Sequence, residues 1–264
     1  MFICRLLERY GLLENEYTEL LSKESYDIND LVEIVKILRS ENGCPWDKVQ
    51  THKTIKKDFL EEVYEVMEAI DLESPEMMRE ELGDVLLQVV FHCVLETEEK
   101  HFGLSEVTTD ICRKLIVRHP HVFGDVQADT VDKVLTNWDS IKKETKGQET
   151  YTQTLESVPK NFPALMRAQK LVKRADRAGA DVGGVEELTG KISELAGQVA
   201  ERDGAGSRED AVRALGQLMF ECAALARVLD ADAEETLTDE NNAYIERFRQ
   251  AEEQARQNGS EIRL

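Results

Sequence analysis

The sequence predicts an all-α protein of the bundle type. In residues 59–70, apolar side chains return every three or four positions, at about 100° per residue around a helix, and so form one stripe. Residues 82–95 are apolar on nearly all sides, which is typical of a helix buried on most of its surface. Because one small module cannot cover so broad a surface alone, we expect dimerisation to complete each module, and the protein to be a homodimer. The stripe consists of Phe59, Val63, Val66, Met67 and Ile70.

Length, composition and charge narrow the class of protein. With 264 residues, 41% of them hydrophobic and 33% charged, the chain is long enough for one large domain or two small ones. Its formal net charge of -20 argues against a nucleic-acid partner, since nonspecific binding of a polyanion needs clustered Lys and Arg. No segment resembles a membrane span, and residues 1–11 are too short and too charged for a signal peptide. We therefore expect a cytoplasmic protein without a membrane partner. The five scattered cysteines lack CxxC spacing and are interpreted as free thiols.

The chain opens with an acidic segment and an amphipathic helix. Residues 1–29 are weakly helical, and we expect a peripheral lead-in there. Residues 31–40 predict a helix that a Gly-Cys-Pro turn ends. Trp46 follows in a loop, where its indole either stacks on a base or packs on its neighbours. His52 and Lys56 lead into the next helix and either contact phosphate or are exposed basic residues.

The helix predicted at residues 59–70 carries a pair of carboxylates. Glu62 falls about 80° from the centre of the apolar stripe and so borders the buried face, whereas Glu61 and Glu68 point to water. Glu65 lies further round, at roughly 140° by the same rotation, and can join Glu62 only if another element covers that side.

One polar seam interrupts the apolar surface of the helix predicted at residues 82–95. Its members lie at i, i+3, i+7 and i+11, within a sector of roughly 80°. A buried carboxylate is costly unless it is paired or bound to a metal. The seam therefore marks a candidate site, and its members are Glu81, Asp84, Gln88 and His92.

Two facing carboxylate pairs predict a metal site. If Glu62 and Glu65 meet Glu81 and Asp84, mutual repulsion raises the pKa values of all four unless a cation neutralises them. All-oxygen ligands suit Mg²⁺ or Mn²⁺ better than zinc. The alternative for a lone Glu-x-x-Glu pair is a solvated helix face. A di-iron bundle would need a Glu-x-x-His on two helices, and neither helix has one.

A further helix, predicted at residues 107–117, leads into an Arg-His-Pro-His motif. Arg118 is a candidate phosphate ligand together with the two histidines, because its guanidinium offers a bidentate fork. The alternative is capping of the helix end by basic residues before the proline. A zinc site at His119 and His121 would lack further Cys or His close by in sequence.

Four segments, in this order, resemble the signature of the MazG family, the all-α nucleoside triphosphate pyrophosphohydrolases. The resemblance runs from about Leu31 to about Glu253. It implies Mg²⁺-dependent hydrolysis between the α and β phosphates, which gives a monophosphate and pyrophosphate. It also implies that the metal ligands are Glu62, Glu65, Glu81 and Asp84. The segments are CPWDKVQTH from Cys44, LEEVYEVMEAID from Leu60, REELGDVLLQVVFH from Arg79 and RHPHVFGD from Arg118.

The end of the first module also resembles the family. Residues 132–144 resemble its closing helix, with Trp138 and Lys142 at the recurrent W-x-x-I-K. A lysine near the triphosphate would offset the charge that builds on the leaving pyrophosphate. We expect the catalytic domain to span residues 30–145. Residues 146–163, which are polar and punctuated by Gly and Pro, are the expected interdomain linker.

The second half resembles a repeat of the first without its chemistry. Residues 164–255 are similar to the family's second domain, and residues 256–264 form a tail. Ala214 and Gln217 stand where the first half has the two carboxylates of its second helix. We interpret this half as a degenerate MazG-like domain with a structural or dimerising role.

Together these features predict a nucleoside triphosphate pyrophosphohydrolase with a role in house-cleaning of nucleotide pools. One carboxylate, Glu61 or Glu62, is expected to serve as the base. The alternatives are a relative of narrower substrate range, such as a dUTP or phosphoribosyl-ATP pyrophosphatase, and a non-catalytic helical interaction protein. The complete quartet of carboxylates argues against the last. The expected catalytic residues are Glu61, Glu62 and Lys142, and the expected substrate-binding residues are Trp46, His52, Lys56, Arg118 and Trp138.

Overall fold

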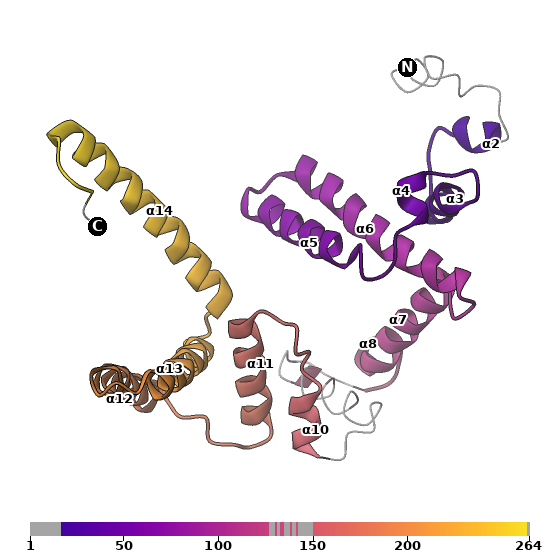
Figure 1. The fold of residues 1–264 in the computed structure, drawn as a ribbon. Coiled ribbons are helices and arrows are strands. Elements are labelled where there is room, and N and C mark those ends of the chain that lie inside the picture. The colour runs from indigo at the N-terminus through magenta and orange to yellow at the C-terminus, as the bar shows by residue number, and fades with distance from the viewer. Residues whose placement is uncertain are drawn as a thin grey trace. The chain divides into compact units, whose positions relative to one another are not determined.

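The structure, a computed structural model, describes residues 17–126, 130, 133–134, 138, 141 and 150–262. All regular elements in these residues are helices, which confirms the predicted all-α class (Figure 1). The helices of the first half are α2 (Thr18–Leu21), α3 (Ile28–Arg39), α4 (Pro45–Lys48), α5 (Lys56–Asp71), α6 (Pro75–Glu98), α7 (Leu104–Arg118) and α8 (Pro120–Phe123). Those of the second half are α10 (Tyr151–Glu156), α11 (Ala164–Arg177), α12 (Val185–Gly204), α13 (Arg208–Val228) and α14 (Ala233–Asn258).

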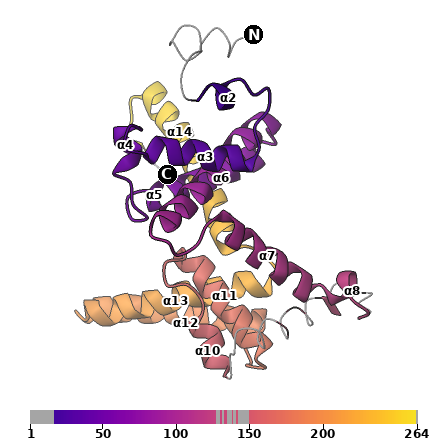
Figure 2. The ribbon, with the colours of Figure 1, turned by 90° about the vertical axis from the view of Figure 1, so that its right-hand side faces the viewer.

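The chain divides into two compact units, Met1–Ala128 and Asp129–Leu264. In the first unit, α5 and α6 form an antiparallel hairpin and α3 packs against α6 (Figures 1 and 2). In the second unit, α12 lies beside α13, and α11 packs against α13 (Figure 2). The predicted domain limits, and the prediction that the two units are repeats of one module, stay predictions.

Local sequence signals set the start of α3 and the turn of the hairpin. Asp27 caps α3 in a capping box with Asp30, in which the side chain of each residue accepts a hydrogen bond from the backbone N–H of the other. α6 begins at Pro75, whose fixed φ suits the first turn, and the Ser74 side chain accepts a backbone N–H of that turn. Glu73 adopts a positive φ of 48° just before it. The chain therefore reverses within three residues and sets α5 against α6.

The core of the first unit lies between α3 and the second half of α6. Its buried side chains are largely β-branched or aromatic, and Leu31, Val32, Leu87 and Leu104 pack against them from the rim. This core packs against the C-terminal half of α6. Its members are Val35, Ile55, Val90, Phe91, Val94 and Leu95.

Arg39 joins three elements at one end of this core. Its Nε and Nη2 donate to the two carboxylate oxygens of Glu98 on α6, each at 2.7 Å. Its Nη1 donates to the carbonyl oxygens of Asp47 at 2.6 Å and Gln50 at 3.2 Å, which holds the α4 segment. The guanidinium lies 5.3 Å from the centroid of the Phe91 ring, and the side chain is only 8% exposed. No single-point cation can make all of these contacts.

We expect Arg39→Lys to lower the free energy of unfolding by about 2 kcal/mol, because two carbonyl oxygens and one carboxylate lose donors in a half-buried place. Urea unfolding followed by circular dichroism measures this. The matched control is Arg213→Lys, since Arg213 makes exposed ion pairs of 3.5 and 3.7 Å, and it should cost less than about 0.5 kcal/mol. Equal losses in the two variants would contradict the structural role of Arg39.

The apolar stripe of α5 is not covered within one chain. Met67 is 50% exposed and Ile70 55%, and Leu82 on the facing α6 is 51% exposed. The expectation that residues 82–95 are buried on most sides is met only by the second half of α6, which packs in the core. Exposed apolar side chains on two helices that pack together are typical of an interface. The predicted homodimer would cover them and stays a prediction.

We expect sedimentation velocity to show a dimer at micromolar concentration, because this exposed apolar face is unstable in water without a partner. Replacing Met67 and Ile70 together by glutamate should shift the dimer to monomer, since a dimer interface would then bury four extra carboxylates. A wild-type protein that sediments as a folded monomer would contradict the dimer.

The second unit has cores lined by small residues. Ala168, Ala223 and Ala233 form one cluster, and Val172, Leu188 and Ala224 form another. Alanines let helix backbones approach closely. Gln169 on α11 ties the turn between α13 and α14, because its amide donates to the Ala231 carbonyl at 2.8 Å and accepts from the Ala233 N–H at 3.0 Å.

Residues 150–158, which belong to the predicted linker, include the helix α10. α10 forms there because Thr150 and Gln153 make a capping box, which the search for apolar periodicity overlooks. Arg174 on α11 donates to the Thr154 carbonyl and, at 2.8 Å, to Ser157 Oγ. Val158 is buried. The segment therefore packs on the second unit.

Among the described residues, no helix combines the length and the apolar character that crossing a membrane requires.

Candidate active site

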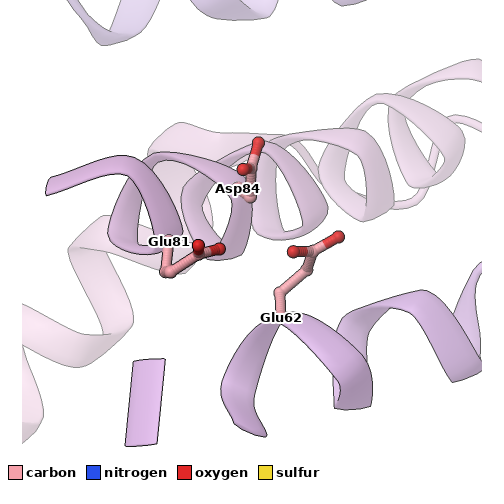
Figure 3. A group of neighbouring side chains, drawn as sticks. All are labelled: Glu62, Glu81 and Asp84. Carbon is pink, nitrogen blue, oxygen red and sulfur yellow. The ribbon is translucent and has the colours of Figure 1, made fainter. Parts of the chain in front are cut away.

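Three of the four predicted metal ligands come together between α5 and α6. Glu62 on α5 points toward Glu81 and Asp84 on α6 (Figure 3). One carboxylate oxygen from each lies within 4.8 Å of those of the other two, and all three side chains are half-buried. This is the one group of three or more potential metal-ligating side chains in the described part of the chain.

Helix geometry explains why these side chains meet. Glu81 and Asp84 are three residues apart, so they lie one above the other on the same face of α6. The antiparallel hairpin brings Glu62 opposite them, while Phe59, three residues earlier on α5, contacts His92 further along α6. The polar seam of α6 therefore runs along the groove against α5, as its spacing predicts.

The cluster resists ionisation in the absence of a cation. Burial raises the pKa of Glu62, and the charges of Asp84, Glu65 and Glu81 raise that pKa further. Burial also raises the pKa of Glu81, with Glu65 as the next cause. Repulsion of this kind is relieved when a hard divalent cation binds, and the set offers oxygen atoms alone. The residues present therefore fit Mg²⁺ or Mn²⁺ and do not favour zinc.

Comparisons with known proteins place this hairpin in a family. Residues 50–123 match the MazG nucleotide pyrophosphohydrolase domain. The chain is 39% identical over 228 residues to the nucleoside triphosphate pyrophosphohydrolase of Escherichia coli strain K12, an alignment that covers 85% of this chain and 87% of that protein. The chain belongs to the MazG family.

Two further relatives define how far the similarity extends. The nucleoside triphosphate pyrophosphohydrolase/pyrophosphatase MazG of Thermotoga maritima is 37% identical over 230 residues, which are 87% of each chain. The uncharacterised protein YabN of Bacillus subtilis is 41% identical over 230 residues, which are 87% of this chain but 47% of YabN. The predicted membership in the MazG family and the predicted class, a hydrolase of nucleotide pyrophosphate bonds, are thereby confirmed.

Glu65, the fourth predicted metal ligand, is exposed on α5 and is not one of the three clustered carboxylates. Its carboxyl nevertheless lies near enough to Glu62 and Glu81 to raise both of their pKa values by charge and by a hydrogen bond. Glu65 therefore lies at the exposed edge of the groove between α5 and α6.

Of the two other predicted catalytic residues, the structure describes Glu61 but not Lys142. Glu61 is exposed, and its Oε1 accepts a hydrogen bond from Lys57 Nζ at 2.6 Å, one turn earlier on α5. It therefore lies outside the carboxylate cluster. Lys142 falls outside the residues that the structure describes.

The predicted substrate-binding residues differ in exposure and in the unit to which they belong. Trp46 lies on α4 with 59% of its surface exposed, so its indole is accessible. Lys56 is exposed at the first position of α5. Arg118 is half-buried at the last position of α7, and Trp138, which belongs to the second unit, is also half-buried.

His52 belongs to a chain of hydrogen bonds that sequence patterns did not predict. Its Nδ1 lies 2.7 Å from His92 Nδ1, and the two rings stack with centroids 5.0 Å apart and planes 3° from parallel. Its Nε2 lies 2.8 Å from Glu96 Oε1. The other oxygen of Glu96 lies 2.7 Å from Nδ1 of His101. Sequence spacing placed His92 on the polar seam but missed Glu96 and His101, although Glu96 follows His92 at i+4.

The second unit has a small cavity lined in part by carboxylates. It has a volume of about 230 Å³ and lies between α12 and α13. Among the described residues of this unit, no three potential metal ligands come together. The loss of carboxylates predicted from the sequence for this half stays a prediction. The lining residues are Lys191, Glu194, Leu195, Gln217 and Glu221.

Proposed function

We propose that this chain is a Mg²⁺-dependent nucleoside triphosphate pyrophosphohydrolase that converts a triphosphate and water to a monophosphate and pyrophosphate. The observation that carries the proposal is the convergence of Glu62, Glu81 and Asp84 at the groove of α5 and α6. The names of relatives that the chain spans almost completely, from Escherichia coli and Thermotoga maritima, support the same substrate class.

Glu62, Glu81 and Asp84 would hold the metal, with Glu65 as the fourth carboxylate of the set. Mn²⁺ is an acceptable substitute, because it takes the same oxygen ligands. When bound, such an ion would neutralise the phosphate oxygens and stabilise the charge that develops as the bond between the α and β phosphates breaks.

A carboxylate of α5 would take the proton from the attacking water. Glu62 suits this role better than Glu61, because Glu62 is half-buried and lies in the groove beside Glu81 and Asp84. The Glu61 carboxylate is occupied by Lys57 and exposed. We therefore assign the base to Glu62 and a supporting role at the surface to Glu61.

The remaining predicted residues would hold the substrate. Lys56 and Arg118 supply positive charge for the phosphates, and the exposed indole of Trp46 supplies a face for a base. Trp138 and Lys142 are assigned to the same task by their place in the W-x-x-I-K segment. His52 would act through His92, to which it is hydrogen bonded.

The second unit would support the first without catalysis of its own. It lacks the clustered carboxylates, and its exposed apolar side chains on α13, among them Met219 and Phe220, suit a dimer contact. A cytoplasmic homodimer that removes unwanted triphosphates from the nucleotide pool is the role that fits these features.

Pyrophosphate release across a panel of standard and damaged triphosphates tests the function. We expect release of one pyrophosphate and one monophosphate per triphosphate, with several bases accepted. Activity confined to a dUTP or phosphoribosyl-ATP substrate would identify a narrower relative. Absence of pyrophosphate with every substrate, from a folded protein in Mg²⁺, would contradict the proposal.

A further inference from the structure

We propose that His52 and Glu96 hold His92 as the neutral tautomer with its proton on Nδ1, so that Nε2 accepts a hydrogen bond from the nucleoside part of the substrate. His92 would thus be a binding residue of the same groove, and His52 and Glu96 would be positioning residues. This inference rests on the proposed function, because it names a contact of that substrate.

The direction of the hydrogen bonds fixes the tautomer. An ionised Glu96 can only accept, so His52 Nε2, at 2.8 Å, must carry a proton and donate it. A neutral His52 then has no proton on Nδ1, and that atom accepts. His92 Nδ1, at 2.7 Å, must therefore be the donor. Its second nitrogen, Nε2, is left with a free lone pair.

The ionisation of the neighbours supports this arrangement. A hydrogen bond from His101, and a smaller contribution from the hydrogen bond of His52, keep the pKa of Glu96 below its usual range. Burial and the nearby His52 lower the pKa of His92, so His92 is neutral near pH 7. The groups that face His92 are His52 from the loop before α5, Glu96 from its own helix, and the uncharged Phe59 ring of α5.

The place of His92 suits a contact with the nucleoside. It lies eleven positions after Glu81, which returns it to within about 20° of the same face of α6. It lies eight positions after Asp84, or about 12 Å along the helix axis. If the carboxylates hold the triphosphate at one end of the groove, His92 lies at the other end, where the sugar and base would follow.

Protonation of His92 would remove the acceptor, because an imidazolium carries a proton on both nitrogens and Nε2 then donates. The lone pair that faces the substrate is then lost. Substrate affinity should therefore weaken as the pH falls, while the turnover number stays nearly constant, because His92 lies away from the bond that breaks.

The tautomer is measured on the full chain with ¹⁵N-labelled histidine by two-bond NMR correlations at pH 7.5. We expect His92 to carry its proton on Nδ1. Glu96→Leu removes the acceptor and should give a mixture of both tautomers. The matched control is His101→Ala, which leaves the bond between His52 and Glu96 in place and should leave the tautomer of His92 unchanged. A wild-type His92 with its proton on Nε2 would overturn the inference.

The contact is measured by kinetics of His92→Asn. Asparagine keeps an amide N–H near the Nδ1 position for His52 but has no counterpart of Nε2. We expect KM to rise about tenfold with kcat changed less than about twofold, as for loss of one hydrogen bond to substrate. The wild-type KM should rise as the pH falls, and that of His92→Asn should not. A wild-type KM and pH profile in the variant would refute the contact.

Comparing substrates identifies the donor that His92 accepts from. A penalty that disappears for 2′-deoxynucleotides assigns the 2′-hydroxyl, and one that disappears for hypoxanthine assigns the exocyclic amine of adenine. An equal penalty for all assigns a hydroxyl that they share. Failure of this inference differs from failure of the proposed function, because the latter would show as full turnover in a Glu81→Gln enzyme, which does not involve His92.

Discussion

Glu81→Gln should lower the turnover of the full-length protein by at least about a hundredfold, which corresponds to about 2.7 kcal/mol of lost transition-state stabilisation. Glutamine keeps the shape of the side chain and removes its charge. Glu81 faces Glu62 across the groove and lies beside Asp84 on α6, with oxygen atoms within 4.8 Å, so the substitution removes one of three clustered ligands. Steady-state pyrophosphate release in excess Mg²⁺ measures the effect.

Three controls separate this loss from a general effect of charge. Glu68→Gln removes an exposed charge from α5 outside the cluster and should retain turnover within about twofold. Glu194→Gln and Glu221→Gln remove the two carboxylates of the cavity between α12 and α13 and should also be near wild type. Near wild-type turnover of Glu81→Gln, or a large loss in the second unit's variants, would show that the chemistry lies elsewhere.

Helical periodicity predicted the parts of the site that belong to single helices. The three-residue spacing of Glu81 and Asp84 fixes their common face wherever the helix lies, so the sequence suffices. The role of Glu65 could not be settled in this way, because it depends on which side of α5 is covered. The turn from Glu73 to Pro75 decides which side of α5 is covered, since it sets α5 against α6.

Helical periodicity could not predict contacts between segments that are distant in the sequence. Arg39 and Glu98 are 59 residues apart, and His52 and His92 are 40 apart. His101 follows the end of α6, past Lys100 with its positive φ of 61°, so its direction is not that of a helical residue. The exposure of Met67 could not be predicted for a different reason. An apolar stripe indicates that a helix surface is apolar, but it does not indicate which chain covers that surface.

The second large effect concerns the metal. We expect EDTA to abolish activity, and added Mg²⁺ or Mn²⁺ to restore it, because Glu62, Glu81 and Asp84 offer carboxylate oxygens alone. Zn²⁺ should fail to restore turnover, since it prefers nitrogen and sulfur ligands. Full turnover in EDTA, after dialysis that removes tightly bound ions, would eliminate the metal site.

The same site should make the free energy of unfolding depend on pH. Without metal this free energy should fall as the pH rises, and Mg²⁺ should oppose that fall. The pKa values of Glu62 and Glu81 in the folded chain lie above their ordinary value of 4.5. The folded state therefore binds more protons than the unfolded state, and stability falls as the pH rises from about 4.5 through the raised values. Mg²⁺ competes with those protons and cancels the repulsion. Its stabilising effect should thus be small at pH 5 and large at pH 8.

Melting temperatures with and without Mg²⁺ across this pH range measure the effect. In the wild type we expect Mg²⁺ to raise Tm more at pH 8 than at pH 5, and the Mg²⁺ concentration at half-saturation to increase as the pH falls. Glu81→Gln should respond less at every pH, because it has lost one ligand and one repelling charge. Glu68→Gln, which changes the net charge equally, should respond as the wild type does. An equal response of the two variants would mean that Mg²⁺ acts on the overall negative charge of the chain and not on this groove.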